Sequence, residues 1–321
     1  MNSKRELKMD IMKVIGLFAI ILAHVSPHEI IFQIRNFDVP LMVFVSGYLS
    51  YNSYKSSKSY FSYVIKRIKR LLIPTWIFLT IYFFIVYICH NYFNVQFYYS
   101  KNQMIDSYLL LEGIGYIWIV RVYLLVELVM PLFIKIVDSF KKYIVFIIII
   151  SLFIINELMC HYNIYNINMF TNYYLSNLIS YGTILLLGLF VRKLNKKEIK
   201  YLLLLFIMIF TAYVLYFFKT EGLFVFTQTR KYPPSLYYLS YSLIVSLLLF
   251  LIEPKIKNIK LNNIIVSISK NSFWIYLWHI LAIYIVSIIK PDIHWTLRYI
   301  LVILIAILIT FIQEKIIKKR V

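Results

Sequence analysis

The sequence predicts an all-α, polytopic membrane protein with about ten transmembrane helices and with both chain ends in the cytoplasm. Of its 321 residues, 61% are hydrophobic and 15% are charged, whereas a soluble domain is about 45–50% apolar and about 25% charged. Apolar runs recur along the whole chain rather than at one end. The basic residues collect in every second connection between these runs, which is the pattern that the positive-inside rule describes.

The predicted spans follow the apolar runs in order. They cover approximately residues 11–29, 37–54, 71–92, 115–134, 143–160, 173–191, 201–218, 236–252, 272–289 and 296–313. Several are shorter than the ~20 residues that usually cross a bilayer. We expect residues 1–321 to form a single transmembrane domain without a soluble domain.

The net charge of +20 is explained by topology. With a cytoplasmic N-terminus, most of the 34 Lys and Arg residues lie in cytoplasmic segments, and this bias requires an even number of spans. On a soluble protein such a charge would suggest nucleic acid binding, but here no nucleic acid partner is implied. The basic cytoplasmic segments are residues 4–13, 55–70, 135–142, 192–200, 255–270 and 315–320.

The first predicted helix carries its charged and titratable side chains on one stripe. Lys13 and His24 are separated by 11 residues, which is about 20° past three full turns and about 16 Å along the axis. Asp10 lies about 40° short of four turns before His24. Because ionisable groups are costly in lipid, we predict a functional His24. The alternative is a Lys that extends to the inner surface and a His wedged between helices.

The second predicted span begins with Asp38 at its outer end, on the same side as His24. From topology alone, we predict that Asp38 orients or charge-stabilises His24. Ser46, Ser50 and Ser53 recur at helical spacing. They form a stripe of small residues along which another helix could approach closely.

Four cations lie in the predicted cytoplasmic loop just before the third span: Lys66, Arg67, Lys69 and Arg70. Arg67 and Arg70 are spaced i, i+3 and face one way, and such a pair suits phosphate because guanidinium groups bind it bidentately. Ordinary positive-inside charge and contact with anionic lipid explain the same residues equally well. The residue pattern leaves both interpretations open.

Two later spans carry further polar side chains. Trp118 and Arg121 lie in the fourth, where an Arg needs a partner or a water-filled cavity. Glu127 is six residues beyond Arg121 and lies on a different face. In the ninth span Tyr276 and His279 share a face, and a His279 that joins two helices by hydrogen bonds is as well supported as a catalytic one.

Several catalytic classes are excluded by their missing motifs. The sequence has no HExxH motif, no Gly-rich phosphate loop and no GxSxG elbow. The histidines outside the predicted helices show no metal-ligand spacing. Metalloenzymes and soluble hydrolases are therefore excluded, and no metal is expected.

These residues, in this order, resemble the integral-membrane acyltransferase 3 family, which includes bacterial polysaccharide O-acetyltransferases. The first helix of that family carries an Asp, then an Arg, ten residues and a His. Asp10, Lys13 and His24 match these places, with Lys in place of Arg. Lys13 keeps the charge of the Arg and loses its bidentate fork.

Four further segments match patterns of that family. Residues 40–49 resemble its Pro-Leu-Phe-Phe-x-x-Ser-Gly-Phe/Tyr-Leu run, and Arg67 and Arg70 its Arg-x-x-Arg before a Leu and a Pro. Residues 118–131 resemble its Trp-Phe-Leu…Pro helix, and residues 272–279 its Ser-x-x-Ile-Tyr-Leu-x-His segment. The Tyr and Pro residues of 232–238 also look like a motif of some members.

The resemblance implies transfer of an acyl group, usually acetyl, to a hydroxyl of a sugar. Cytoplasmic acetyl-CoA, or another acyl-CoA, would be the donor, with Lys13, Arg67 and Arg70 holding its phosphates. A lipid-linked or cell-surface glycan would be the acceptor on the outer side. The implied location is the bacterial plasma (inner) membrane, where the multi-pass chain is surrounded by the lipid bilayer.

In that mechanism His24 would be the general base for the acceptor hydroxyl, since the ordinary histidine pKa of about 6.5 suits this role at neutral pH. An acyl-His intermediate is the alternative. Asp38, or less suitably Asp10, would set the tautomer of His24. The residues expected to line the substrate cavity are Ser46, Trp118, Arg121, Tyr276 and His279.

Two other functional classes remain open. A polytopic transporter or flippase of a polysaccharide or lipid-linked sugar would share the helices and the buried polar groups, but it would be expected to show internal repeats and Gly- or Pro-broken helices. The sequence shows no repeat and has only seven Gly. A membrane glycosyltransferase would usually need a sizeable loop with carboxylates, and the outer loops here are short. Acyl transfer is therefore favoured.

Overall fold

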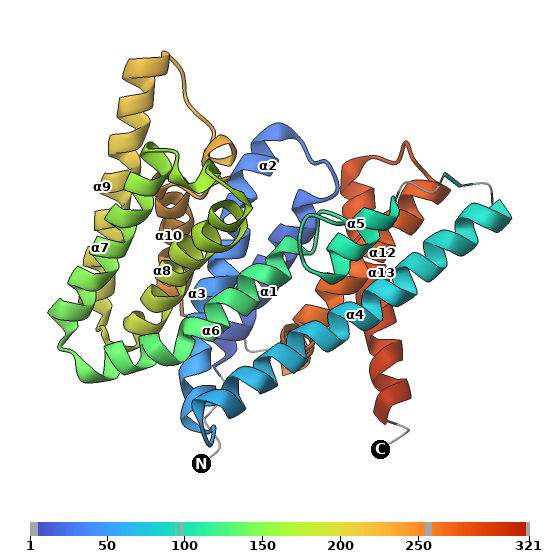
Figure 1. Cartoon of the computed structure of the whole chain (residues 1–321), viewed down its shortest axis with the longest axis horizontal. Coiled ribbons are helices and arrows are strands. Elements are labelled where there is room, and N and C mark those ends of the chain that lie inside the picture. The colour runs from blue at the N-terminus through green and yellow to red at the C-terminus, as the bar shows by residue number, and fades with distance from the viewer. Residues whose placement is uncertain (1–5, 94, 97–98, 254–258, 319–321) are drawn as a thin grey trace. The chain divides into compact units, whose positions relative to one another are not determined.

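The computed structural model describes residues 6–93, 95–96, 99–253 and 259–318. Every regular element in these ranges is a helix, which confirms the predicted all-α class (Figure 1). The main helices are α1 (Leu7–Ala23), α2 (Glu29–Ile34), α3 (Asp38–Lys55), α4 (Tyr60–Phe93), α5 (Lys101–Tyr108), α6 (Trp118–Ser139), α7 (Lys142–His161), α8 (Ser176–Phe190), α9 (Lys196–Glu221), α10 (Leu236–Leu251), α11 (Ile259–Lys270), α12 (Ser272–Ile289) and α13 (Trp295–Lys318).

Each of the ten predicted spans overlaps one of these helices. Among the described residues, seven helical stretches are long and apolar enough to cross a membrane. They are Glu29–Lys55, Tyr60–Tyr92, Lys142–His161, Thr171–Lys193, Lys196–Glu221, Ser272–Ile289 and Trp295–Ile316. α10 is a shorter apolar helix, and α1 and α6 account for the remaining predicted spans. The fold is that of a polytopic membrane protein.

Two predicted boundaries are wrong. The first helix ends at Ala23 rather than near residue 29, because Ser26 adopts a left-handed backbone with φ 53° and precedes a proline, which disfavours helix. The basic segment of residues 66–70 is not a loop but part of the 34-residue helix α4. Arg and Lys are good helix formers, and Pro74 is accommodated inside the helix.

The described residues form two compact units. Unit 1 comprises residues 1–32, 68–121 and 256–321, and unit 2 comprises residues 33–67 and 122–255. In unit 1, α12 packs against α13, where the Trp278 indole donates to Gln313 Oε1 at 2.7 Å. α13 is tied to α1 by a 3.1 Å bond from the Tyr299 hydroxyl to the Phe18 carbonyl.

Unit 2 is organised around α3 and α8, which touch through glycines. A Cβ on Gly47 would lie 2.1 Å from the Leu185 carbonyl oxygen, and one on Gly188 would lie 2.1 Å from that of Phe44. In the helical stretch Thr171–Lys193, which contains α8, 78% of the 18 most apolar consecutive residues are buried. The corresponding share is 22% for α7 and for α9. α8 is therefore the centre of the unit, whereas α7 and α9 expose apolar side chains that suit lipid.

Contacts inside unit 2 agree with the alternating direction of the helices. Lys142 Nζ lies 3.0 Å from Glu198 Oε1, and both residues belong to predicted cytoplasmic ends. Asn156 Nδ2 donates at 2.9 Å to the carbonyl of Pro234, and both belong to predicted outer ends. Inner ends therefore meet inner ends and outer ends meet outer ends, as the positive-inside assignment requires.

Candidate functional site

His24 lies directly after the last turn of α1 and is half-buried. Its backbone N–H bonds to the Ile21 carbonyl at 3.0 Å, so the residue caps the helix that ends there. Of the predicted stripe, Asp10 and Lys13 lie on α1, and His24 is the residue that follows it. Asp10 Oδ1 accepts a 2.6 Å bond from Ser269 Oγ at the end of α11, and both side chains are buried.

The imidazole of His24 contacts that of His279 on α12. His24 Nδ1 lies 3.1 Å from His279 Nε2, and the ring centroids are 5.2 Å apart at 24°. α1 and α12 run in the same direction, because Asp10 and Ser269 meet near their starts and the two histidines meet further along. Both helices were predicted to begin at the cytoplasmic side, and the contacts are consistent with that.

The hydrogen bonds of His279 assign the tautomers of both rings. Its Nδ1 contacts the Tyr276 carbonyl one turn earlier, and a carbonyl oxygen only accepts. Nδ1 of His279 therefore carries a proton, and its Nε2 is the acceptor in the neutral ring. His24 Nδ1 must donate to it, which leaves the lone pair of the His24 ring on Nε2.

Tyr116 completes this group and was not singled out from the sequence. Its ring stands edge-on to His24, with centroids 4.7 Å apart, and lies 6.1 Å from His279. The Tyr276 hydroxyl donates to the Tyr116 carbonyl. We call His24, Tyr116, Tyr276 and His279 the histidine cluster. Tyr116 is one of 29 tyrosines, and no sequence pattern distinguishes it.

The loop that carries Tyr116 is held by Arg121. The buried guanidinium donates from Nη1 to the carbonyl oxygens of Leu110 at 2.7 Å and Leu111 at 3.2 Å. These bonds give the buried guanidinium two polar partners, which a mid-membrane Arg requires. Arg121 was predicted to line the substrate cavity. The two bonds from its Nη1 hold the loop, and a substrate role stays a prediction.

A glycine is also required in this loop. Gly113 has φ 46°, and a Cβ there would lie 2.3 Å from the Ser107 Oγ. The same Oγ accepts a 3.0 Å bond from the backbone N–H of Ile114. The turn therefore packs against the end of α5 and sets where the chain reaches Tyr116.

Asp38 lies in unit 2, at the first residue of α3, in a buried ionic network. Its Oδ2 is 2.8 Å from Arg35 Nη1 and its Oδ1 is 3.6 Å from Lys231 Nζ. Burial lowers the pKa of Lys231 from the ordinary lysine value, because the ammonium loses hydration, and the charge of Asp38 opposes this. His24 belongs to the other unit, and the proposed pairing of Asp38 with His24 stays a prediction.

Arg67, predicted to bind phosphate, contacts a carboxylate inside unit 2. Its Nε lies 3.5 Å from Glu127 Oε2, and its Nη2 donates to Ser50 Oγ at 3.4 Å. Ser50 donates in turn to Glu127 Oε1 at 3.2 Å, and the Tyr63 hydroxyl donates to Oε2. Glu127 can be singled out from the sequence because it is a carboxylate in an apolar run. Only the tertiary structure shows that it pairs with Arg67.

The remaining predicted residues lie on four helices. Arg70 is exposed on α4, one turn after Arg67, and Lys13 is half-buried on α1. Ser46 is half-buried on α3 and is a neighbour of Tyr123 of α6. Trp118 is half-buried at the start of α6. Nothing in these positions tests the binding roles predicted for them.

The helices and the histidine cluster define a polytopic membrane protein with a polar centre suited to proton transfer. A family model described as an acyltransferase domain matches residues 6–313. The match spans most of the chain, and the protein belongs to the acyltransferase 3 family. No curated protein and no solved structure is significantly similar to it.

Proposed function

We propose that this membrane acyltransferase moves an acyl group, in the first instance acetyl, from cytoplasmic acyl-CoA to a hydroxyl of a cell-surface or lipid-linked glycan. The bacterial plasma membrane is the proposed location. The observation that carries the proposal is the 3.1 Å contact between His24 Nδ1 and His279 Nε2, in a chain that belongs to an acyltransferase family.

In this proposal His24 is the general base. His279 holds the proton of His24 on Nδ1 and so keeps a lone pair on Nε2, which takes the proton of the acceptor hydroxyl. The hydroxyl oxygen attacks the thioester carbonyl, a C–O bond forms and the C–S bond breaks. The departing CoA thiolate then takes the proton from His24. His279 is a positioning residue that accepts a hydrogen bond from the charged ring.

The donor phosphates would be held by Lys13, Arg67 and Arg70. Arg67 suits this role because its contacts with Glu127 and Ser50 use Nε and Nη2, and a guanidinium offers five N–H donors. The carboxylate would thus fix the fork in one orientation, and Nη1 is the group that we assign to a phosphate oxygen. Arg70 adds a second cation one turn along the same helix.

The test is acyl transfer in membranes that contain the wild-type protein or His24→Ala. Membranes receive labelled acetyl-CoA, and the surface glycan is analysed for ester-linked label. We expect label with wild type and a loss of about 10²- to 10⁴-fold with His24→Ala, the usual contribution of a general base. His294→Ala, which removes an exposed loop histidine, should transfer at the wild-type rate.

Three results would count against the proposal. Equal labelling by wild type and His24→Ala, at equal membrane abundance, would remove His24 from the chemistry. Absence of label with acetyl-CoA and with succinyl-CoA would contradict acyl-CoA as the donor. Label on lipid or protein but not on glycan would contradict the acceptor.

A further inference from the structure

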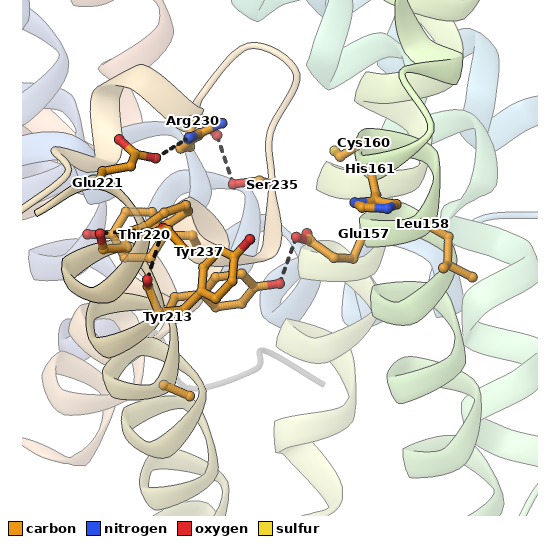
Figure 2. A pocket seen from close by; sticks show the side chains of 13 residues that line it. Glu157, Leu158, Cys160, His161, Tyr213, Thr220, Glu221, Arg230, Ser235 and Tyr237 are labelled. Atoms are coloured by element: carbon orange, nitrogen blue, oxygen red, sulfur yellow. Dashed lines mark hydrogen bonds and ion pairs between the residues drawn. The ribbon is translucent and has the colours of Figure 1, made fainter.

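Unit 2 contains an open cavity that the proposed chemistry does not use. It has a volume of about 770 Å³ and lies between the C-terminal turns of α7, the last turns of α9 and the loop that follows α9 (Figure 2). Binding sites for small molecules commonly measure about 300–1,000 Å³. All three segments belong to predicted outer ends, so the cavity would open on the side from which a glycan approaches.

Aromatic rings form one side of the cavity. Tyr213, Tyr216, Phe217 and Tyr237 all line it. The rings of Phe217 and Tyr237 are 5.1 Å apart at 68°, and those of Tyr213 and Phe217 are 6.0 Å apart and stacked. Tyr216 is 58% exposed. Phe217 and Tyr237 are buried behind it. Tyr216 therefore presents the ring face whose π electrons carry negative potential and attract the C–H bonds of a ligand.

Oriented polar groups line the cavity together with the rings. The Tyr213 hydroxyl donates to Glu157 Oε1 at 2.6 Å (Figure 2). The Leu236 N–H donates to Oε2 at 2.7 Å, so this carboxylate is held at two points. Each of its oxygens has a further lone pair with which to accept from a ligand hydroxyl. Glu221 Oε1 lies 3.0 Å from Arg230 Nη2 at the rim.

The charges of the cavity restrict the class of ligand. Two carboxylates, Glu157 and Glu221, face one guanidinium, Arg230, with His161 beside them. This balance offers no excess positive charge to a polyanion such as acyl-CoA. The polar groups would lose hydration against a lipid tail without gaining a partner. A ligand with apolar C–H faces and many neutral hydroxyls satisfies both the ring wall and the carboxylates.

We propose that this cavity binds an uncharged oligosaccharide on the outer side of the protein. The inference rests on the proposed function only for the role of that sugar, which would be part of the acceptor glycan. Its rings would pack on the exposed Tyr216, and its hydroxyls would donate to Glu157 and Glu221. Arg230, whose guanidinium lies 4.9 Å from the Phe217 ring centroid, would donate to the sugar oxygens at the rim.

The experiment is saturation-transfer NMR on the full-length protein in lipid nanodiscs, because maltoside detergents would compete for a sugar site. The probes are maltotriose, cellotriose and tri-N-acetylchitotriose, each titrated to about 10 mM so that a Kd near 1 mM is measurable. We expect saturable transfer to at least one trisaccharide. Its Kd should rise about threefold to tenfold in Tyr216→Ala and in Glu221→Gln.

The matched control is Tyr87→Ala, which removes a tyrosine of unit 1 that is likewise 58% exposed. Its Kd should equal that of the wild type. Absence of saturable transfer from all three trisaccharides would overturn the inference. So would an unchanged Kd in both cavity variants, or an equal loss in Tyr87→Ala.

A last variant separates this inference from the proposed function. His24→Ala should bind the trisaccharide with the wild-type Kd, since its side chain belongs to unit 1. Binding that depends on Tyr216 without any acyl transfer would support sugar binding in the cavity and contradict the transferase chemistry proposed above. Acyl transfer without trisaccharide binding would support the transferase chemistry and contradict sugar binding in the cavity.

Discussion

His24 Nδ1 lies 3.1 Å from His279 Nε2, although the two residues are 255 positions apart in the chain. The contact explains why one predicted polar residue follows the end of α1 and the other lies on α12, which packs beside α1 in unit 1. The Tyr276 carbonyl accepts from Nδ1 of His279, and this fixes the direction of the hydrogen bond between the two rings. It makes His279 the acceptor and His24 the donor, so that the two candidate residues form one hydrogen-bonded pair.

His279→Ala should lower the rate of acyl transfer with little change in the KM for the donor. The loss should be about 10- to 100-fold, the usual cost of removing a group that orients a functional histidine. His279→Gln should retain part of the rate, because its side-chain oxygen can accept from His24 Nδ1. Measured kcat and KM for the two variants decide the question. An Ala variant with wild-type kcat would leave His279 a purely structural role.

Arg70→Gln should raise the KM for acetyl-CoA about threefold to tenfold and leave kcat unchanged, because it removes a charge-assisted bond to a phosphate. Increasing salt should reduce the difference between this variant and wild type by screening the exposed charge. Lys58→Gln, another exposed cation of the same cytoplasmic segment, is the control. A KM that rises equally in both variants would show only a general effect of positive charge.

Gly188→Ala should destabilise unit 2 by about 1–3 kcal/mol, the cost of overpacking a close contact. The added Cβ would lie 2.1 Å from the Phe44 carbonyl oxygen, and backbone cannot move aside as a flexible side chain can. Gly182→Ala on the same helix meets only Phe133 ring atoms at 3.7 Å and should be tolerated. The Tm values of the two variants and of the wild type are measured by thermal unfolding in lipid nanodiscs. Equal Tm values would show that α3 and α8 can separate at this point.

Asp38→Asn should destabilise the protein by about 3–5 kcal/mol, because it leaves two buried cations, Arg35 and Lys231, without their carboxylate. Replacing Lys231 by Met in the same chain should restore part of that stability. Acyl transfer is then measured in the stabilised double variant. Near wild-type kcat there would assign Asp38 to the fold, whereas a persistent loss would support its predicted action on His24.

The relation of Arg67 to Glu127 shows where sequence reasoning stops. The i, i+3 spacing of Arg67 and Arg70 places both on one face of α4. The spacing carries no information about a carboxylate 60 residues further along. Similarly, the stripe of Ser46, Ser50 and Ser53 suggested a close helix approach. The approach occurs instead at Gly47, and Ser50 bonds to Glu127.

By itself the sequence determined the class of protein, the approximate positions of its apolar helices and the residues whose charge lipid would penalise. These properties follow from composition and from local periodicity, because a helix satisfies its own backbone and displays side chains at a known angle. Only the tertiary structure decided that His24 meets His279, that Tyr116 joins them, and that aromatic rings and carboxylates enclose a cavity beside Glu157. Such contacts join residues far apart in the chain, and packing between helices selects them.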